Sequence, residues 1–228
     1  MKSRSKRYKK LAELVDSEKK YEIDNAIEII KKMDGTTKFD QTVLLTLSLG
    51  IDPKKADQLI RGSVSLPKGI GKTRKVIVFA EGEDATKATA AGADEVGSAE
   101  LVKKIEGGWL DFDVAIACTY MMRHIGKLGK VLGPQGKMPS PKAGTVTDDI
   151  KTAVTEFKAG RIEFRADAGG VVHAPVGKLS FSQKDLKANL ESFIEHIKNM
   201  KPASVKGTYI INAFLSGTMT PSIGLVIK

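Results

Sequence analysis

Two glycine-lysine segments of the chain have the residue types of a loop that holds nucleotide phosphates, and both fail on spacing. In such a loop backbone N–H groups and a lysine hold the phosphates, and a first glycine stands five positions before the second. The segment 69–73 has Leu66 where that glycine belongs, and the Gly136-Lys137 pair has Val131. A complete phosphate loop is therefore missing from both segments, and nucleotide hydrolysis is not expected.

The side chains that serve as nucleophiles or metal ligands are few and scattered. Cys118, the single cysteine, ends an apolar run, where a buried structural thiol is more common than a nucleophile. His124 follows six residues later without an acid to orient it, and His173 and His196 lie far along the chain. One cysteine cannot form an intramolecular disulfide, and this set does not fit a Cys/His zinc site. We expect no catalytic residues, no metal and no cofactor.

Three other segments carry residues suited to RNA. RNA is recognised by aromatic stacking and by polar groups that contact bases and sugars, with lysines on phosphates. Such residues occur in the segments 38–40, 173–178 and 218–220. Each also has a simpler explanation, because Phe39 could be an edge core residue, His173 a histidine with ordinary partners and Met219 a gap filler.

Charge supports a polyanionic partner. The chain has 37 Lys and Arg against 27 Asp and Glu, a formal net charge of +10. The segment 118–147 contains no acid and is rich in glycine and proline, which predicts a basic surface loop. We expect this loop either to meet a second RNA or to pack against the outer domain defined below and shape domain closure, and a plain linker is the third reading. Its basic residues are Arg123, Lys127, Lys130, Lys137 and Lys142.

No run of residues approaches the roughly 18 to 20 consecutive apolar residues that a membrane span needs. The first ten residues hold six basic side chains, and no apolar core of a signal peptide follows them. We therefore expect a protein without a membrane partner, in the reducing cytoplasm.

Around these segments the periodicity predicts two kinds of architecture. Outside the centre it indicates a helix over 21–33, a strand over 39–51 and a second over 59–66, and then a hairpin of strands 161–165 and 171–175. A helix beginning after Ser182 and strands over 208–215 and 222–227 complete this part.

The central part alternates short apolar strands with helices, which is typical of βαβ units around a parallel sheet. We therefore predict an α/β protein in which an outer α+β domain, 1–67 with 160–228, holds an inserted domain, 68–159. Two chain crossings at glycine and proline positions predict a hinge at Pro67, Gly69 and Gly160.

Several motifs, taken in order, make the chain resemble the L-one family of ribosomal proteins from the mobile side stalk of the large ribosomal subunit. The resemblance covers essentially the whole chain and is closest to the bacterial form. The matching segments are KFD at 38–40, GIDP at 50–53, RGSVSLPKGIGK at 61–72, GWLDFD at 108–113, KLGKVLGPQGKMPSPKAGT at 127–145, GRIEFRAD at 160–167 and HAPVGK at 173–178.

The resemblance implies that the inserted domain is a Rossmann-like three-layer α/β domain and that the outer domain binds large-subunit rRNA. It also implies release of deacylated tRNA from the exit site, and translational repression through the leader of the protein's own mRNA. A cytoplasmic protein on the large ribosomal subunit, monomeric when free, is expected. The alternative from another class is an enzyme that binds a nucleotide or metabolite in the central domain, and a regulator acting only on mRNA is a third.

Residues carried over from the family's RNA-contacting strip fall in the segments singled out above. One departure is Thr220, which stands where the family's Thr-Met-Gly-Pro turn has glycine, and threonine does not adopt positive φ cheaply. The contact at this position is therefore the least secure. The implied rRNA-binding residues are Lys38, Phe39, Thr42, Thr218, Met219 and Thr220, with a second group of His173, Lys178 and Ser180.

Overall fold

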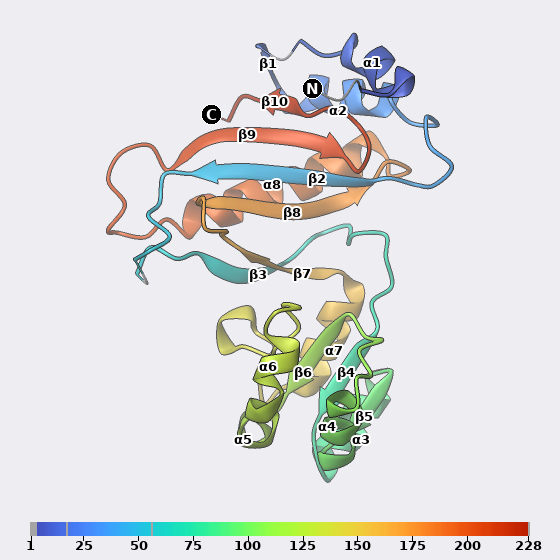
Figure 1. The fold of residues 1–228 in the computed structure, drawn as a ribbon, viewed down its shortest axis with the longest axis vertical. Coiled ribbons are helices and arrows are strands. Elements are labelled where there is room, and N and C mark those ends of the chain that lie inside the picture. Colours follow the sequence, from blue (N-terminus) through green and yellow to red (C-terminus); the bar gives the residue numbers. More distant parts are fainter. Residues whose placement is uncertain (1–3, 17, 56, 228) are drawn as a thin grey trace. The chain divides into compact units, whose positions relative to one another are not determined.

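The computed structural model describes residues 4–16, 18–55 and 57–227 of the chain, which divides into two compact units (Figure 1). The first unit combines Met1–Gly71 with Phe164–Lys228, and the second is Lys72–Glu163. At both crossings the boundary between the units lies a few residues later in the chain than predicted from the sequence, where the boundaries were 67/68 and 159/160.

The first unit is built on a five-stranded sheet. Its first pair of strands is parallel and the other pairs are antiparallel. The strand order across the sheet is β1 (Lys20–Tyr21), β10 (Ile223–Leu225), β9 (Ile210–Gly217), β2 (Thr42–Leu49) and β8 (Val171–Lys178).

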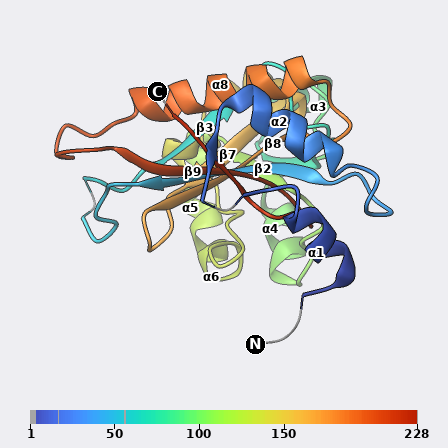
Figure 2. The same ribbon diagram turned by 90° about the horizontal axis from the view of Figure 1, so that it is seen from above.

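Strict alternation along β2 separates the two faces of this sheet. Val43, Leu45, Leu47 and Leu49 are buried, while the residues between them are only half-buried, as the sequence pattern predicts. The long helices α2 (Ile23–Lys32) and α8 (Gln183–Asn199) pack together over the buried face, as Figure 2 shows from above. Burial of this apolar layer, with Ile27, Ile30, Leu190 and Phe193 from the helices, forms the core of the unit.

The predicted hairpin of residues 161–165 and 171–175 is wrong. The strand β7 (Arg161–Arg165) pairs with β3 (Arg61–Ser65) in a two-stranded sheet, and β8 joins β2 instead. Only a single bridge, Ala166 to Val172, links the two segments directly. The eight-residue β8 finds a partner of matching length in β2, which the short β7 cannot provide.

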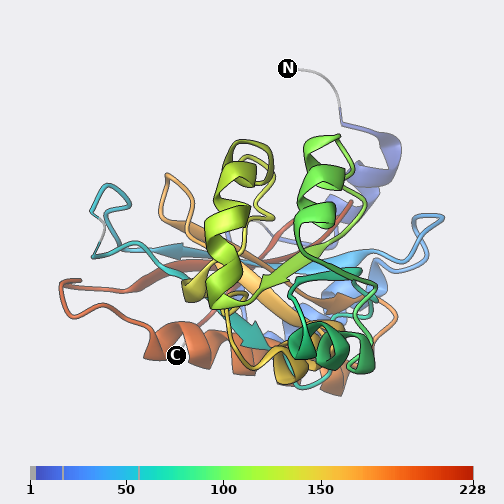
Figure 3. The ribbon, with the colours of Figure 1, turned by 90° about the horizontal axis from the view of Figure 1, so that it is seen from below.

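The second unit has the predicted βαβ organisation. Its parallel sheet has the order β5 (Glu95–Gly97), β4 (Val76–Phe79) and β6 (Val114–Ala117), and every residue of β4 and β6 is buried. Helices lie on both faces of the sheet (Figure 3). On one face are α3 (Glu83–Ala90) and α7 (Ile150–Ala159), and on the other are α4 (Ala99–Glu106) and α5 (Met122–Ile125).

The basic segment 118–147 is a packed structure, not a linker. It forms a chain of single turns in which Ile125, Leu128 and Leu132 are fully buried in the core of the second unit. These turns are η1 (Thr119–Met121), α5, η2 (Gly126–Leu128), α6 (Gly129–Leu132) and η3 (Pro141–Ala143). Within the described part of the chain, no helix is long and apolar enough to cross a membrane.

A buried amide anchors the first chain crossing to the first unit. Asn189 of α8 is fully buried, and its Oδ1 accepts a hydrogen bond of 3.0 Å from the backbone N–H of Lys68. Its Nδ2 donates to the carbonyl oxygens of Gly69, at 2.9 Å, and Val176, at 2.8 Å. Gly69 has a positive φ of 62° and Gly160 ends α7 with a φ of 113°, conformations that favour glycine. Hinge motion at Pro67, Gly69 and Gly160 stays a prediction.

Replacing Asn189 by leucine should lower the free energy of unfolding by about 2–4 kcal/mol, because one buried and two partly buried backbone groups lose their partner. The measurement is urea unfolding of the full chain. Asn199→Leu, at the exposed end of the same helix, is the matched control. Equal stability of the two variants would contradict a structural role for the Asn189 amide.

Candidate RNA-binding site

Strand β2 brings three distant segments of the chain together at its first residues. Thr42 pairs with Lys178 on β8, and Val43 pairs with Gly217 on β9. Because both neighbours are antiparallel to β2, their last residues meet the beginning of β2 at one edge of the sheet. The segments 38–42, 178–180 and 218–220 are therefore side by side.

A β-bulge decides which way Lys178 points. The register of β8 against β2 shifts between Val43 and Leu44, whose partners are Gly177 and Pro175. At this shift β8 has one residue more than β2, between Pro175 and Gly177. Without that extra residue, alternation from His173 would direct the side chain of Lys178 to the buried face. The bulge reverses the alternation, and the Lys178 ammonium donates to the hydroxyl of Thr42 at 3.0 Å.

Short polar contacts hold the hydroxyl groups of the site in place. The Thr42 N–H donates to Oγ1 of Thr218 at 3.1 Å, and the Thr218 hydroxyl donates back to the Thr42 carbonyl at 3.4 Å. The Ser180 hydroxyl donates to the Asp40 carboxylate at 2.7 Å. Asp40 is thus a positioning residue that sequence reasoning missed, although it belongs to the KFD motif.

Gln41 is a second missed residue and sits beneath the turn 217–220. It is buried, and its Oε1 accepts the N–H of Met219 at 2.9 Å. Thr220 closes the same turn, because its hydroxyl oxygen accepts the N–H of Gly217 at 2.7 Å. Positive φ among the described residues occurs only at glycines, so Thr220 adopts no strained conformation. Alternation along the segment before β2 is the signal that would have placed Gln41 inside.

Two apolar side chains point to solvent at this site. Phe39 is 52% exposed and Met219 is 47% exposed, whereas most large apolar side chains of this unit are buried. Lys38 beside them is also exposed. The interpretation of Phe39 as an edge core residue and of Met219 as a gap filler does not fit this exposure. Such side chains can pack on the sugars or bases of an RNA.

His173 lies apart from the cluster, farther along the open face of the sheet. It pairs with Thr46, and its Nδ1 is 3.2 Å from the Thr46 hydroxyl. Its Nε2 is 4.0 Å from the carboxylate of Asp167. Backbone N–H groups of Val171 and Gly169 hold the pKa of Asp167 below its usual range, so a carboxylate stands beside the ring.

The chemistry of this surface suits paired RNA. Hydroxyl groups and exposed backbone can read the 2′-hydroxyls of a shallow minor groove, and lysines can contact phosphates. Among the residues that the structure describes, no group of three or more histidine, cysteine and acidic side chains is placed to bind a metal ion.

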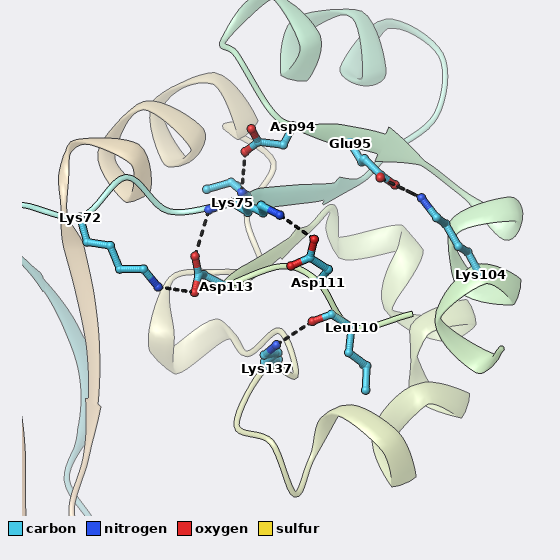
Figure 4. A network of polar contacts seen from close by, with 10 residues as sticks. Lys72, Lys75, Asp94, Glu95, Lys104, Leu110, Asp111, Asp113 and Lys137 are labelled. Atoms are coloured by element: carbon cyan, nitrogen blue, oxygen red, sulfur yellow. Dashed lines mark hydrogen bonds and ion pairs between the residues drawn. The ribbon is translucent and has the colours of Figure 1, made fainter. Parts of the chain in front are cut away.

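The basic residues of the second unit have two different roles. Lys137 is half-buried, and its ammonium donates to the Leu110 carbonyl at 2.9 Å (Figure 4). The ammonium also lies 4.9 Å from the centre of the Phe112 ring. It is therefore used within the unit. The other four predicted residues of this surface are exposed: Arg123, Lys127, Lys130 and Lys142.

The same view shows a cluster of ion pairs where the chain enters the second unit (Figure 4). Asp113 accepts from the Lys72 ammonium at 2.8 Å and from the Lys75 N–H at 3.2 Å, and Asp111 binds the Lys75 ammonium at 2.6 Å. Burial alone would raise the pKa of Asp113, but these hydrogen bonds and the charges of Lys72 and Arg74 hold the pKa below its usual range.

The sequence of this chain is similar to those of a known protein family. A model of the ribosomal protein L1p/L10e family matches residues 29–221. The large ribosomal subunit protein uL1 of Kosmotoga olearia is 53% identical over 225 residues, 99% of this chain and 97% of the relative. That of Chlamydia caviae is 52% identical over 225 residues, again 99% of this chain and 97% of the relative.

The chain is thus of the class of RNA-binding ribosomal proteins, and the alternative of a nucleotide- or metabolite-binding enzyme is set aside. Within that class, it belongs to the ribosomal protein L1p/L10e family.

The carboxylate of Asp113 should make stability depend on pH. A carboxyl group whose pKa is lowered by folding stabilises the protein above its ordinary pKa, and this stabilisation is lost as pH falls through the folded value. We therefore expect Asp113→Asn to lower the free energy of unfolding at pH 7 by about 1 kcal/mol.

Urea titrations of both proteins between pH 7 and pH 3 measure this effect. The difference between wild type and variant should shrink toward the acidic end. A difference that is independent of pH would show that the charge of Asp113 contributes nothing.

Proposed function

We propose that the chain is a protein of the large ribosomal subunit whose first unit binds rRNA at the mobile side stalk. One observation carries the proposal: residues from three segments converge at the start of β2, with fixed hydroxyls around exposed Phe39 and Met219. In this proposal the contacts are made by Lys38, Phe39, Thr42, Lys178, Ser180, Thr218, Met219 and Thr220, with His173 on the adjoining face. The relatives are named as large-subunit proteins, which supports this placement and a cytoplasmic, ribosome-bound location.

The proposal extends to two further RNAs. The protein would repress its own translation by binding the leader of its mRNA at the same site. Such a leader mimics the rRNA and competes with it for the same hydroxyls and lysines. The second unit would contact exit-site tRNA through Arg123, Lys127, Lys130 and Lys142, and so aid the release of deacylated tRNA. Free of the ribosome, the protein would be a monomer.

Truncating the exposed apolar side chains tests the primary site. Phe39→Ala and Met219→Ala should each weaken binding of a stalk rRNA fragment by about 1–3 kcal/mol, because stacking and packing on the RNA are lost. Affinity is measured at one stated salt concentration, with an unrelated hairpin for comparison.

Ile211→Ala is the matched control for both. Ile211 is 51% exposed on β9, and it lies near the start of the strand, at the opposite end from the turn 217–220. If all three variants bind the fragment equally well, Phe39 and Met219 do not belong to the site.

The tRNA surface makes a separate prediction. Lys127→Ala with Lys130→Ala should reduce the salt dependence of tRNA binding by about two counterions, because two exposed ammonium groups no longer meet phosphates. Lys137→Met should leave the salt dependence unchanged and lower stability instead, since Lys137 bonds to Leu110. Equal salt dependence in the double variant and the wild type would remove this surface from tRNA binding.

A further inference from the structure

A pocket lies next to the turn 217–220, between that turn and the beginning of the chain. It has a volume of about 930 Å³, near the upper end of the roughly 300–1,000 Å³ typical of ligand sites. From one side it is lined by Arg4, Arg7 and Tyr8, at and within the short helix α1 (Lys6–Ala12). The other side is made by the turn itself, with Thr218 and Thr220.

The chemistry of the lining is that of an anion site. Arg4 and Arg7 contribute two guanidinium groups, and none of the described residues that line the pocket is acidic. The guanidinium carbon of Arg4 lies 4.9 Å from the centre of the Tyr8 ring, so a planar cation and an aromatic ring stand together. A guanidinium group can donate two parallel hydrogen bonds to two oxygens of one phosphate. The aromatic ring can pack on a sugar, and the threonine hydroxyls can form hydrogen bonds with it.

The pocket is continuous with the surface assigned to rRNA. Thr218, Met219 and Thr220 line the pocket and also belong to the cluster at the start of β2. Met219 is 47% exposed between the two regions. An RNA that packs on Met219 therefore has its next backbone groups within reach of the guanidinium groups.

We propose that this pocket binds a backbone phosphate and the adjoining ribose of the same RNA that occupies the sheet edge, an inference that rests on the proposed rRNA binding. The segment 4–8 is then part of the RNA site. Arg4 and Arg7 hold the phosphate, and the hydroxyls of Thr218 and Thr220 lie on the sugar side.

The test uses the full chain and a stalk rRNA fragment, with affinity measured as a function of salt. Arg4→Ala with Arg7→Ala should weaken binding by about tenfold or more and reduce the salt slope by about one counterion, the amount expected for one phosphate contact. Lys9→Ala with Lys10→Ala removes the same charge from the same helix, from exposed residues outside the pocket lining, and should change the slope far less. Arg4→Lys with Arg7→Lys should restore the slope but only part of the affinity, because lysine cannot bind phosphate in the paired manner.

Thermal unfolding of each variant separates a folding defect from a binding defect. Equal affinity and slope in the arginine and lysine double-alanine variants would overturn the pocket assignment while leaving the proposed function standing. If the wild-type chain itself binds the stalk fragment no better than an unrelated hairpin, the proposed function fails, and the pocket assignment fails with it.

Discussion

The pairing of β2 with both β8 and β9 is the constraint on which the first unit depends. One side of β2 contributes Val43, Leu45, Leu47 and Leu49 to the core beneath α2 and α8, which fixes the register of the strand. A slip of one residue would bury Thr42 and expose this layer. The same register sets Lys178 and Thr218 against Thr42, so core packing and site geometry are fixed together.

The site is rigid because most of its polar groups are already hydrogen-bonded to one another. Thr218 and Lys178 both bond to Thr42, and the buried Gln41 holds the turn at Met219. Binding a ligand on such a surface costs little conformational entropy, since few side chains need to be ordered. Asp40 and Gln41 are not among the residues proposed to contact RNA. They act by positioning Ser180 and Met219.

The second unit uses its charges differently. Lys72, Lys75 and Lys137 bond to groups of their own unit, and these contacts surround the entry to its parallel sheet. The exposed basic residues of the segment 118–147 lie instead on the single-turn helices around Leu128 and Leu132, whose burial keeps this segment packed. A count of positive charge along the sequence does not separate these two groups, because it records neither burial nor hydrogen-bond partners.

Sequence by itself determined the periodic parts of this protein: the alternation of β2, the amphipathic α8, the βαβ centre and the family motifs. These patterns follow from local burial, which repeats every two or 3.6 residues. Tertiary structure alone decided the partner of β8, the direction of Lys178 after the bulge and the meeting of Arg4 with the turn at Thr218. Each of these depends on strand register or on contact between residues far apart in the chain, and no local pattern encodes such contacts.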